Sequence, residues 1–399
     1  MKWADNLISI DEALGLILKS IIPTNCTEVL PVIESSGRVL AEDVIATHDV
    51  PPFNRSAMDG YALNSSDTVR ASAQNTASLT ISGEIYAGDS SYVQVKPGHC
   101  SYIATGAAMP AGADAVIRIE KVTKSGNKIH FNSPVKPGEN IAPAGEDIRS
   151  GEVVLQSGCQ LKPARVGVLS SQGISKVKVY CKPMISVITT GEELAQSPEP
   201  LKPGQIYDVN NATLCSLIMV NGGLPVKLAS LGDRVESLVK GFKTALSSDM
   251  VVVSGGSSVG QKDYMHEMLS SMGQVLFHGL NVKPGKPTLF AIVQGKPVLA
   301  LPGYPTSCLL NAYLLLKPAV HKLARLPDEK QNTVEAVLDG RISASARRQF
   351  VPVQLDGLTA RPIGKESGAI TAIAHASGYI TVEENSGLNQ GASTAVTLF

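Results

Sequence analysis

The sequence predicts a multidomain protein that combines an α/β domain with two mainly-β modules. Its 399 residues exceed the roughly 100–200 residues that one domain usually contains. Within residues 183–326, apolar strand-like runs alternate with amphipathic helical runs, which indicates a Rossmann-like, doubly wound parallel sheet. Residues 51–139 and 327–399 contain short β-type runs between turn residues and lack a helical period. They predict an inserted mainly-β domain and a C-terminal β-barrel-like domain.

The remaining residues, 1–50 and 140–182, are predicted to form one discontinuous α/β linker domain. Ser9 begins a capping box at the start of an amphipathic helix that Pro23 ends. Proline- and glycine-rich segments stand at both ends of residues 51–139. These boundaries mark that stretch as an insertion between the two halves of the linker domain.

Four strands and four helices are expected in the central domain. The strands are the apolar runs at 184–189, 226–231, 250–253 and 298–301. The helices are the segments that start at Asn210 or Asn211, at Val235, at Tyr264 and at Thr306. In such a sheet, ligands bind where the carboxyl ends of the strands open into loops, so these loops are the candidate site.

The charge balance argues against a nucleic-acid partner. Thirty-five basic and 35 acidic side chains give a formal net charge of zero, and only 5% of the residues are aromatic. Binding to nucleic acid normally needs a basic excess for the phosphates and aromatic platforms for the bases. No apolar stretch reaches the about 20 residues of a membrane span, and no signal peptide is visible. We therefore expect a soluble, cytoplasmic protein without a membrane partner.

The cysteines and histidines predict no metal site of their own. The six cysteines lie far apart without a CxxC pair, and the seven histidines show no HxxxH or HxH spacing. Reduced, buried thiols are the expected state of the cysteines.

A loop rich in glycine and serine follows the predicted strand 250–253 and precedes a helix. Its backbone N–H groups and the helix N-terminus can cradle a phosphate. The spacing of Gly255 and Gly260 matches a P-loop, but Gln261 stands where the lysine would be. A tight turn that merely needs glycine is the alternative; we favour anion binding, because serine hydroxyls can also point into the loop. The candidate ligand groups are Ser254, Gly255, Gly256, Ser257 and Gly260.

Three further loops carry polar groups near predicted strand ends. Lys283 and Lys286 stand on a proline-fixed turn and favour an anionic ligand, with a solvated surface turn as the alternative. Pro302 and Gly303 lead into a helix, where ordinary capping is the alternative. Glu193 offers a carboxylate to sugar hydroxyls, a base or a cation. Because most of these loops leave strands of one predicted sheet, we expect a common site.

The same loops, taken in order, resemble those of a known family over nearly the whole chain. The segments that carry the resemblance are PPFNRSAMDGYA (51–62), Thr105-Gly106, GEDI (145–148), TGEEL (190–194), residues 254–264, KPGKP (283–287) and LPGYP (301–305). As an ordered set they are similar to the molybdopterin molybdenumtransferase family, which includes MoeA and the gephyrin E domain.

That resemblance implies an elongated four-domain homodimer, in which the linker domain of residues 1–50 and 140–182 is also the dimerisation domain. It implies an enzyme that inserts molybdate into adenylylated molybdopterin and releases AMP, with Mg²⁺ as cofactor. It also implies transient contact with the molybdopterin adenylyltransferase. It assigns catalytic roles to Asp59, Asp147, Asp263, Lys283 and Lys286, and metal contacts to Asp263 and Asp233. Beside the loop residues named above, it assigns cofactor-binding roles to Thr105, Glu193, Arg347 and Ser367. The resemblance implies that Asp59, Thr105 and Asp147 approach the site from the other subunit.

The sequence departs from the family pattern at three positions. These departures affect the expected anion contacts and reaction rate more than the expected fold. Gly232 replaces one of two adjacent acids, Tyr304 replaces the asparagine of a PGNP segment, and Pro352 replaces an arginine. Two alternatives stay open. One is a pterin-binding paralogue that uses tungstate or catalyses another reaction, as in competence/nicotinamide-deamidase proteins, although the complete Asp59 and Asp147 segments argue against the latter. The other is a non-enzymatic, gephyrin-like scaffold, against which the lack of an attached adenylylating domain argues.

Overall fold

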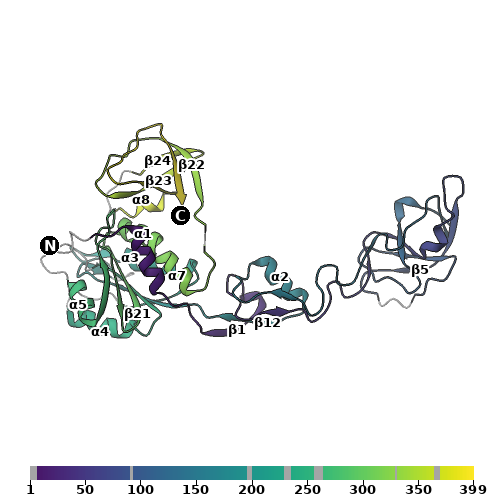
Figure 1. Cartoon of the computed structure of the whole chain (residues 1–399), viewed down its shortest axis with the longest axis horizontal. Coiled ribbons are helices and arrows are strands. Elements are labelled where there is room, and N and C mark those ends of the chain that lie inside the picture. The colour runs from purple at the N-terminus through teal and green to yellow at the C-terminus, as the bar shows by residue number, and fades with distance from the viewer. Residues whose placement is uncertain are drawn as a thin grey trace.

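The computed structural model describes residues 7–89, 93–195, 200–228, 235–255, 264–328, 330–363 and 369–399. Figure 1 shows an elongated chain: the α/β domain and the C-terminal β module lie at one end, an outer β module lies at the other, and a small middle module joins them. This arrangement confirms the predicted fold class, in which an α/β domain is combined with β modules.

A six-stranded sheet forms the middle layer of the α/β domain, in the order β16-β13-β17-β21-β20-β18. Its strands are β13 (Met184–Thr189), β16 (Leu224–Lys227), β17 (Met250–Ser254), β18 (Gly273–His278), β20 (Leu289–Val293) and β21 (Lys296–Leu301). The first four in this order are parallel, as predicted, but β20 runs antiparallel to both of its neighbours, β21 and β18. The expectation of an entirely parallel sheet is therefore wrong at this edge. Gln294 and Gly295, both with positive φ, form the two-residue turn that reverses the chain between β20 and β21.

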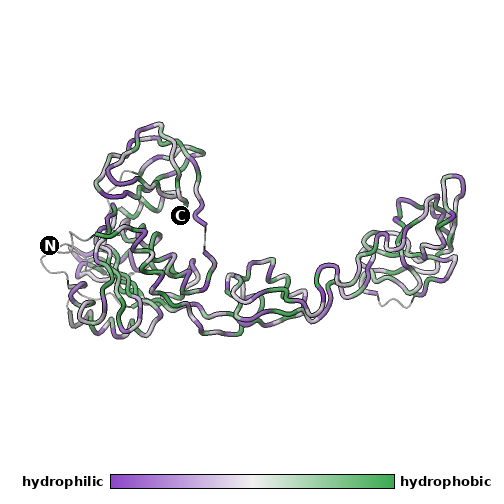
Figure 2. Tube along the Cα trace, viewed as in Figure 1, coloured by the Kyte–Doolittle hydropathy of each residue, from purple (hydrophilic) through white to green (hydrophobic). Residues whose placement is uncertain are grey.

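Helices cover both faces of this sheet. They are α1 (Ile10–Ser20), α3 (Val209–Val220), α4 (Val235–Ala245), α5 (Tyr264–Met272), α6 (Pro305–Asn311) and α7 (Lys317–Leu323), with a π-helical turn, Ala312–Leu316, between the last two. Because strand side chains alternate, Val252 faces the apolar cluster of α1, α3, α6 and α7, while Val251 and Val253 face that of α4 and α5. Figure 2 shows apolar residues concentrated along the sheet. None of the described helices has the length and apolar character needed to cross a bilayer.

Helix α1 begins as predicted but packs elsewhere than expected. Ser9 Oγ accepts a hydrogen bond from the N–H of Glu12 at 3.1 Å, which caps the helix. Ile10 and Ile17 are buried in the core of the α/β domain. Residues 1–50 are predicted to belong to the linker domain, whereas the apolar face of this helix packs on the α/β domain.

The middle module is built from two separate stretches of chain. They contribute the strand pairs β1 (Thr27–Pro31) with β12 (Lys176–Tyr180) and β2 (Val44–Ile45) with β11 (Val153–Leu155), the short 3₁₀ turn Val32–Glu34 and helix α2 (Pro163–Ser171). Both stretches share one apolar core that includes Leu40, Leu161 and Val179. Helix α2 was not predicted, because only Leu169 among its residues is buried and the apolar stripe is weak. The boundaries proposed for the discontinuous domain stay a prediction.

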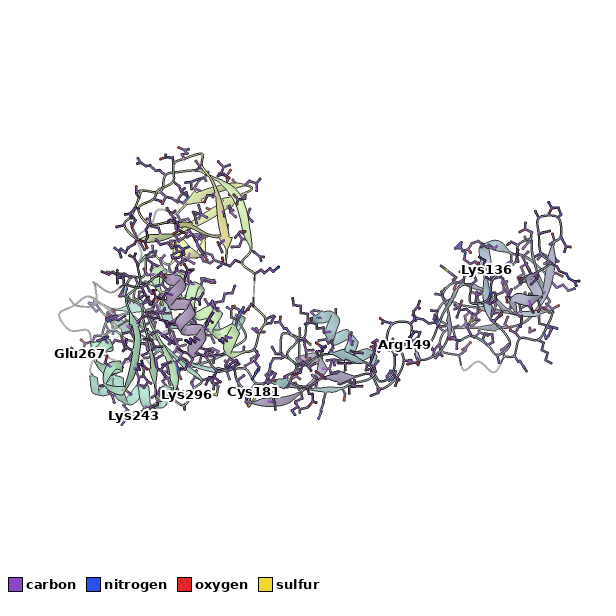
Figure 3. The ribbon with its side chains drawn as sticks, in the orientation of Figure 1. Lys136, Arg149, Cys181, Lys243, Glu267 and Lys296 are labelled. Carbon is purple, nitrogen blue, oxygen red and sulfur yellow. A yellow bond between two sulfur atoms is a disulfide. The ribbon has the colours of Figure 1, made fainter. Side chains whose placement is uncertain are left out.

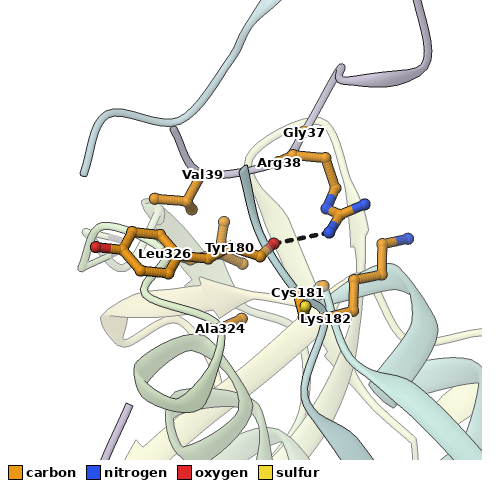
Figure 4. Close-up of a pocket in the computed structure, with 9 residues that line it drawn as sticks. Gly37, Arg38, Val39, Tyr180, Cys181, Lys182, Ala324 and Leu326 are labelled. Atoms are coloured by element: carbon orange, nitrogen blue, oxygen red, sulfur yellow. Dashed lines mark hydrogen bonds between the residues drawn. The ribbon is translucent and has the colours of Figure 1, made fainter. Parts of the chain in front are cut away.

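Two chain segments join the middle module to the α/β domain, and a disulfide links them. Cys26 and Cys181 are bonded, with Cα atoms 5.3 Å apart, so the expectation of reduced thiols is wrong for this pair. Their separation of 155 residues left no local spacing signal in the sequence. Arg325 donates to Thr24 O at 2.6 Å and stacks on the ring of Tyr180 at 4.3 Å. Figure 4 shows the small hollow that Tyr180 and Cys181 line at this junction.

The outer and C-terminal modules are each organised around one sheet. The outer sheet contains β4 (Gly60–Leu63), β5 (Ala77–Ile85), β6 (His99–Ile103), β7 (Ala115–Arg118), β8 (Thr123–Ser125) and β9 (Lys128–Phe131). The C-terminal sheet contains β22 (Thr333–Leu338), β23 (Arg348–Asp356), β24 (Thr359–Pro362), β25 (Gly378–Val382) and β26 (Ser393–Leu398), joined by β19 (Val282–Lys283) from the α/β domain. Because β23 pairs with both β24 and β25, the C-terminal strands close into the predicted barrel. The smaller elements are β3 (Arg55–Ser56), β10 (Ile141–Ala142), β14 (Leu194–Ala195), β15 (Ile206–Tyr207) and α8 (Thr371–Ala374).

Gly60 lies at a close backbone approach in the outer sheet. A Cβ atom at this position would stand 2.0 Å from the carbonyl oxygen of Ile117, so β7 would have to move. We expect Gly60→Ala to lower the free energy of unfolding by about 3 kcal/mol, the upper part of the usual range for overpacking. Gly83→Ala is the matched control, because its Cβ would meet only a methyl group of Val93 at 3.7 Å. Equal shifts of the urea midpoint in the two variants would contradict this prediction.

Candidate functional site

The carboxyl ends of β13, β17 and β21 lie side by side and open onto one rim of the α/β domain. The N–H of Thr190 donates to Ser254 O at 2.9 Å, which joins the loop after β13 to the end of β17. Ser254 Oγ donates to Pro302 O at 3.1 Å, which joins β17 to the loop after β21. These loops meet because the three strands are parallel neighbours in the sheet.

Gly255 permits the close approach of these loops. Its φ of +100° favours glycine, and a Cβ atom would stand 2.3 Å from the carbonyl oxygen of Thr190. A Cβ atom on Gly303 would stand 3.5 Å from the Cα of Gly255, so the loops after β17 and β21 are also in contact. The other predicted groups of this loop lie outside the described residues: Gly256, Ser257, Gly260 and Asp263.

Glu193 stands on the same rim. It is exposed, and its backbone carbonyl accepts from the N–H of Ile206 at 2.9 Å. A Cβ atom on Gly191 would stand 2.8 Å from either carboxylate oxygen of Glu193, so this carboxylate folds back toward the end of β13. The structure thus brings five predicted site residues to one place: Glu193, Ser254, Gly255, Pro302 and Gly303.

The loop that carries Lys283 and Lys286 is held by a buried amide. Asn311 of α6 is fully buried, and its Nδ2 donates to Gly285 O at 3.0 Å and to Thr288 Oγ1 at 2.8 Å. Lys283 is exposed and Lys286 is half-buried. Asn311 is the last residue of α6, so the lysine-bearing loop is held at the far end of the helix that starts directly after the loop that follows β21.

The C-terminal module borders the lysine-bearing loop. Strand β19 pairs with β23, and the guanidinium of Arg347 donates to Val282 O at 3.4 Å. Thr306 Oγ1, at the start of α6, donates to Ala369 O at 2.9 Å. Arg347 is therefore near the strand that carries the first lysine. Ser367 lies outside the described residues, two positions before Ala369.

The first turn of α3 adds two residues that sequence reasoning did not place in the site. Asp208, and not Asn210 or Asn211, is the N-cap, because its Oδ1 accepts from the N–H of Asn211 at 3.0 Å. Its Oδ2 accepts from Thr189 Oγ1 at 2.5 Å, which ties the helix to β13. Asn210 contacts the loops after β17 and β21. An aspartate directly before the predicted helix was the signal that could have identified the cap.

Asp59 and Thr105 form a hydrogen-bonded pair in the outer module. The backbone N–H and the Oγ1 of Thr105 both donate to Asp59 Oδ1, each at 2.7 Å. The backbone hydrogen bond first, and the hydroxyl second, lower the pKa of Asp59 below its ordinary value of 3.8. The pair therefore presents an ionised carboxylate at the surface of the outer module.

The outer-module residues do not reach the rim of their own chain. Figure 1 places the outer module, marked by β5, at the opposite end of the molecule from β21. Asp147 lies in the connection between the middle and outer modules, near Arg149 of Figure 3, and its N–H donates to Val50 O at 3.0 Å. Within one chain, the structure separates Asp59, Thr105 and Asp147 from the other predicted site residues.

Thr105→Val tests the environment of Asp59. The change removes the hydroxyl but keeps the backbone N–H, which is the larger cause of the lowered pKa. We expect the pKa of Asp59 to rise without reaching 3.8, so that protonation on acidification begins at a higher pH than in the unchanged chain. Carboxyl-carbon NMR titration measures this, with Thr123→Val on β8 as the control. An unchanged pKa in Thr105→Val would show that the hydroxyl does not act on this carboxylate.

The described part of the chain supplies no complete metal site. Within it, no three His, Cys, Asp or Glu side chains are grouped so that they could hold a metal ion. Asp233 and Asp263, from which contact with Mg²⁺ is expected, lie outside the described residues, as does Gly232. Their place relative to the rim therefore stays a prediction.

Comparison with known proteins extends over most of the chain. The MoeA N-terminal region (domain I and II) matches residues 8–173, a probable molybdopterin binding domain matches residues 186–322, and the MoeA C-terminal region (domain IV) matches residues 335–399. The Molybdopterin molybdenumtransferase of Haemophilus influenzae is 37% identical over 79% of this chain and 78% of its own length. That of Staphylococcus epidermidis is 34% identical over 94% of this chain and 91% of its own length.

A solved structure agrees with this result over the whole length. The molybdopterin biosynthesis MoeA protein from Pyrococcus horikoshii has a TM-score of 0.85 and 34% identity, covering 99% of this chain and 100% of that one. Its coverage includes the elongated middle and outer modules as well as the α/β domain and its rim of strand ends. With all parts matched in sequence and in structure, the chain belongs to the MoeA family.

Proposed function

We propose that this chain is a molybdopterin molybdenumtransferase, an enzyme of molybdenum cofactor biosynthesis. Its substrates are adenylylated molybdopterin and molybdate, and its products are the molybdenum cofactor and AMP. The observation that carries the proposal is the meeting of Ser254, Gly255, Pro302 and Gly303 at one rim, beside a lysine-bearing loop. The names of relatives that match most of the chain support the same activity.

The proposed substrates account for the cationic groups near this rim in a chain without net charge. Phosphate groups and molybdate are anions, and Lys283, Lys286 and Arg347 supply positive charge. The glycine-rich segment after β17 is proposed to supply backbone N–H donors, which bind an anion without carrying a full charge themselves. Fixed cations and dipoles stabilise the charge that develops on a departing phosphate without the reorganisation that water requires.

Mg²⁺ is proposed to bind through Asp263, with Asp233 as a second carboxylate. Carboxylate oxygens are ligands that Mg²⁺ prefers, and it is commonly held by one or two of them together with substrate phosphates. Such a site needs no cluster of three protein ligands. When bound, the ion would neutralise part of the phosphate charge.

We also propose a homodimer in which the outer module of one subunit completes the rim of the other. Asp59, Thr105 and Asp147 would then act on the substrate that the partner subunit holds. The separation of the outer module from the rim of its own chain supports this arrangement, as does the surface position of the Asp59 carboxylate. Exposed apolar side chains on the middle module, Val29 at 62% and Ile33 at 81%, also suit burial against a second copy.

Three finer expectations belong to the same proposal. The first is the division into the domains 1–50 with 140–182, 51–139, 183–326 and 327–399. The second is transient contact with the molybdopterin adenylyltransferase, which would deliver the adenylylated substrate. The third is a cytoplasmic location, where that contact would take place.

An assay of nucleotide release tests the activity. The purified chain is incubated with adenylylated molybdopterin, Mg²⁺ and either molybdate or no oxyanion, and AMP is measured. We expect AMP release that depends on molybdate. A parallel reaction with tungstate in place of molybdate shows which oxyanion the chain uses. A preference for tungstate would favour the alternative of a pterin-binding paralogue that uses tungstate. Binding of adenylylated molybdopterin without AMP release would reject the transferase and favour a scaffold.

A further inference from the structure

Asn210 joins two loops of the proposed site through its side-chain amide. Its Nδ2 donates to Ser254 Oγ at 2.8 Å and to Gly303 O at 2.7 Å. Ser254 Oγ in turn donates to Pro302 O at 3.1 Å. A single amide nitrogen therefore cross-links the end of β17 to the loop after β21.

The partners of this amide fix its orientation. A carbonyl oxygen only accepts hydrogen bonds, so the nitrogen and not the oxygen must face Gly303 O. The Oδ1 of Asn210 is then buried without a hydrogen-bond partner among the described residues. Leaving a buried acceptor unpaired costs free energy, and such groups call for an explanation other than stability.

Helix α3, which carries Asn210, is itself hydrogen-bonded to the sheet. Asp208, its N-cap, accepts from Thr189 Oγ1 at 2.5 Å and so bonds the same helical turn to β13. The first turn of α3 therefore holds the ends of all three strands that open onto the rim. Asn210 itself is half-buried, so a substitution at this position should not create a cavity in the core.

We propose that Asn210 is a positioning residue that holds the end of β17, at Ser254, and the loop after β21, at Gly303, at the separation that adenylylated molybdopterin requires. This inference rests on the proposed function. Without the amide, Ser254 Oγ and Gly303 O lose the nitrogen that bridges them, and only the hydrogen bond from Ser254 Oγ to Pro302 O still joins the two segments. Substrate binding then has to order the segment of Gly303. Because Asn210 acts through these loops, its loss affects binding more than the chemical step.

Two variants and one control test the proposal by steady-state kinetics. Asn210→Ala removes the amide, and Asn210→Asp keeps its shape but offers a carboxylate that cannot donate to Gly303 O. Each is expected to raise KM for adenylylated molybdopterin roughly tenfold, or about 1.4 kcal/mol, while kcat changes by less than about threefold. Thr213→Ala is the matched control, since Thr213 Oγ1 donates to Asn210 O at 3.1 Å within the same helix. It removes a side-chain hydrogen bond to the Asn210 backbone without removing the cross-link, so its KM should stay at the wild-type value.

Hydrogen exchange gives a second readout that does not depend on turnover. In both Asn210 variants, peptides that cover residues 250–255 and 301–305 should exchange faster than in the wild type and in Thr213→Ala, before substrate is added. An unchanged KM, an unchanged exchange rate, a fall of kcat alone, or loss of folding in both variants would each overturn the proposal. If the wild-type chain shows no molybdate-dependent AMP release, the proposed function is rejected instead. The hydrogen-exchange experiment then tests alone whether Asn210 holds the two segments together.

Discussion

Mixing Asp59→Ala chains with Lys286→Ala chains is expected to restore a molybdate-dependent AMP release that neither variant shows alone. In a mixed dimer, one rim combines the intact Lys286 of the first chain with the intact Asp59 of the second, while the other rim lacks both. Such a dimer should have about half of the wild-type activity, and a random one-to-one mixture about a quarter. The expectation follows from the position of the outer module, which lies far from the rim of its own chain.

A second mixture serves as the control for this complementation. Asp59→Ala and Asp147→Ala both change a residue that one subunit would contribute to the rim of its partner. Every rim of their mixed dimers therefore lacks one of these two carboxylates. That mixture should stay inactive. Co-expression with two different affinity tags isolates the mixed dimers, and AMP release per dimer is the measurement. If the first mixture stays inactive while both chains fold and dimerise, or if the second recovers, the site is not shared between subunits.

Local pattern predicted the central sheet best where the chain is continuously apolar. The run 184–189 coincides with β13, and the helix predicted to start at Tyr264 begins there as α5. Strand β16 was predicted at 226–231 but starts at Leu224, because Pro225 weakens a strand prediction even though an edge strand tolerates it. The antiparallel strands β18 and β20 were missed, because the expected alternation of strand and helix does not reveal a hairpin.

That the loops meet could be predicted from the topology of the sheet, whereas the side chains that hold the loops in place could not. Parallel strands place their carboxyl ends at one edge, so the proximity of Ser254 and Gly303 could be predicted from the order of elements. The amides of Asn210 and Asn311 bond to partners 44 and 26 positions away, which no periodicity encodes. Such contacts depend on how the helices seat against the sheet, and only the folded chain shows them.

Lys286→Met is expected to lower kcat for AMP release by roughly 10²–10³-fold, the effect seen when one preorganised charge-stabilising group is removed. Lys286 is half-buried in the loop that Asn311 holds, so its side chain has less freedom to move than that of the exposed Lys283. An anchored cation acts on developing phosphate charge without first having to be ordered. Methionine keeps the length and the apolar stem of the side chain, so the packing of the loop should survive.

Two comparison variants separate the loss of charge from damage to the fold. Lys286→Arg keeps the charge but changes its geometry, and it should retain an intermediate kcat. Lys243→Met, in the last turn of α4 away from the rim, should keep the wild-type kcat. Rapid-quench measurement of AMP at saturating molybdate gives kcat, and circular dichroism confirms the fold. Should Lys286→Met turn over like the wild type, the lysine-bearing loop would be a structural support, and the positive charge of the site would have to come from Lys283 and Arg347.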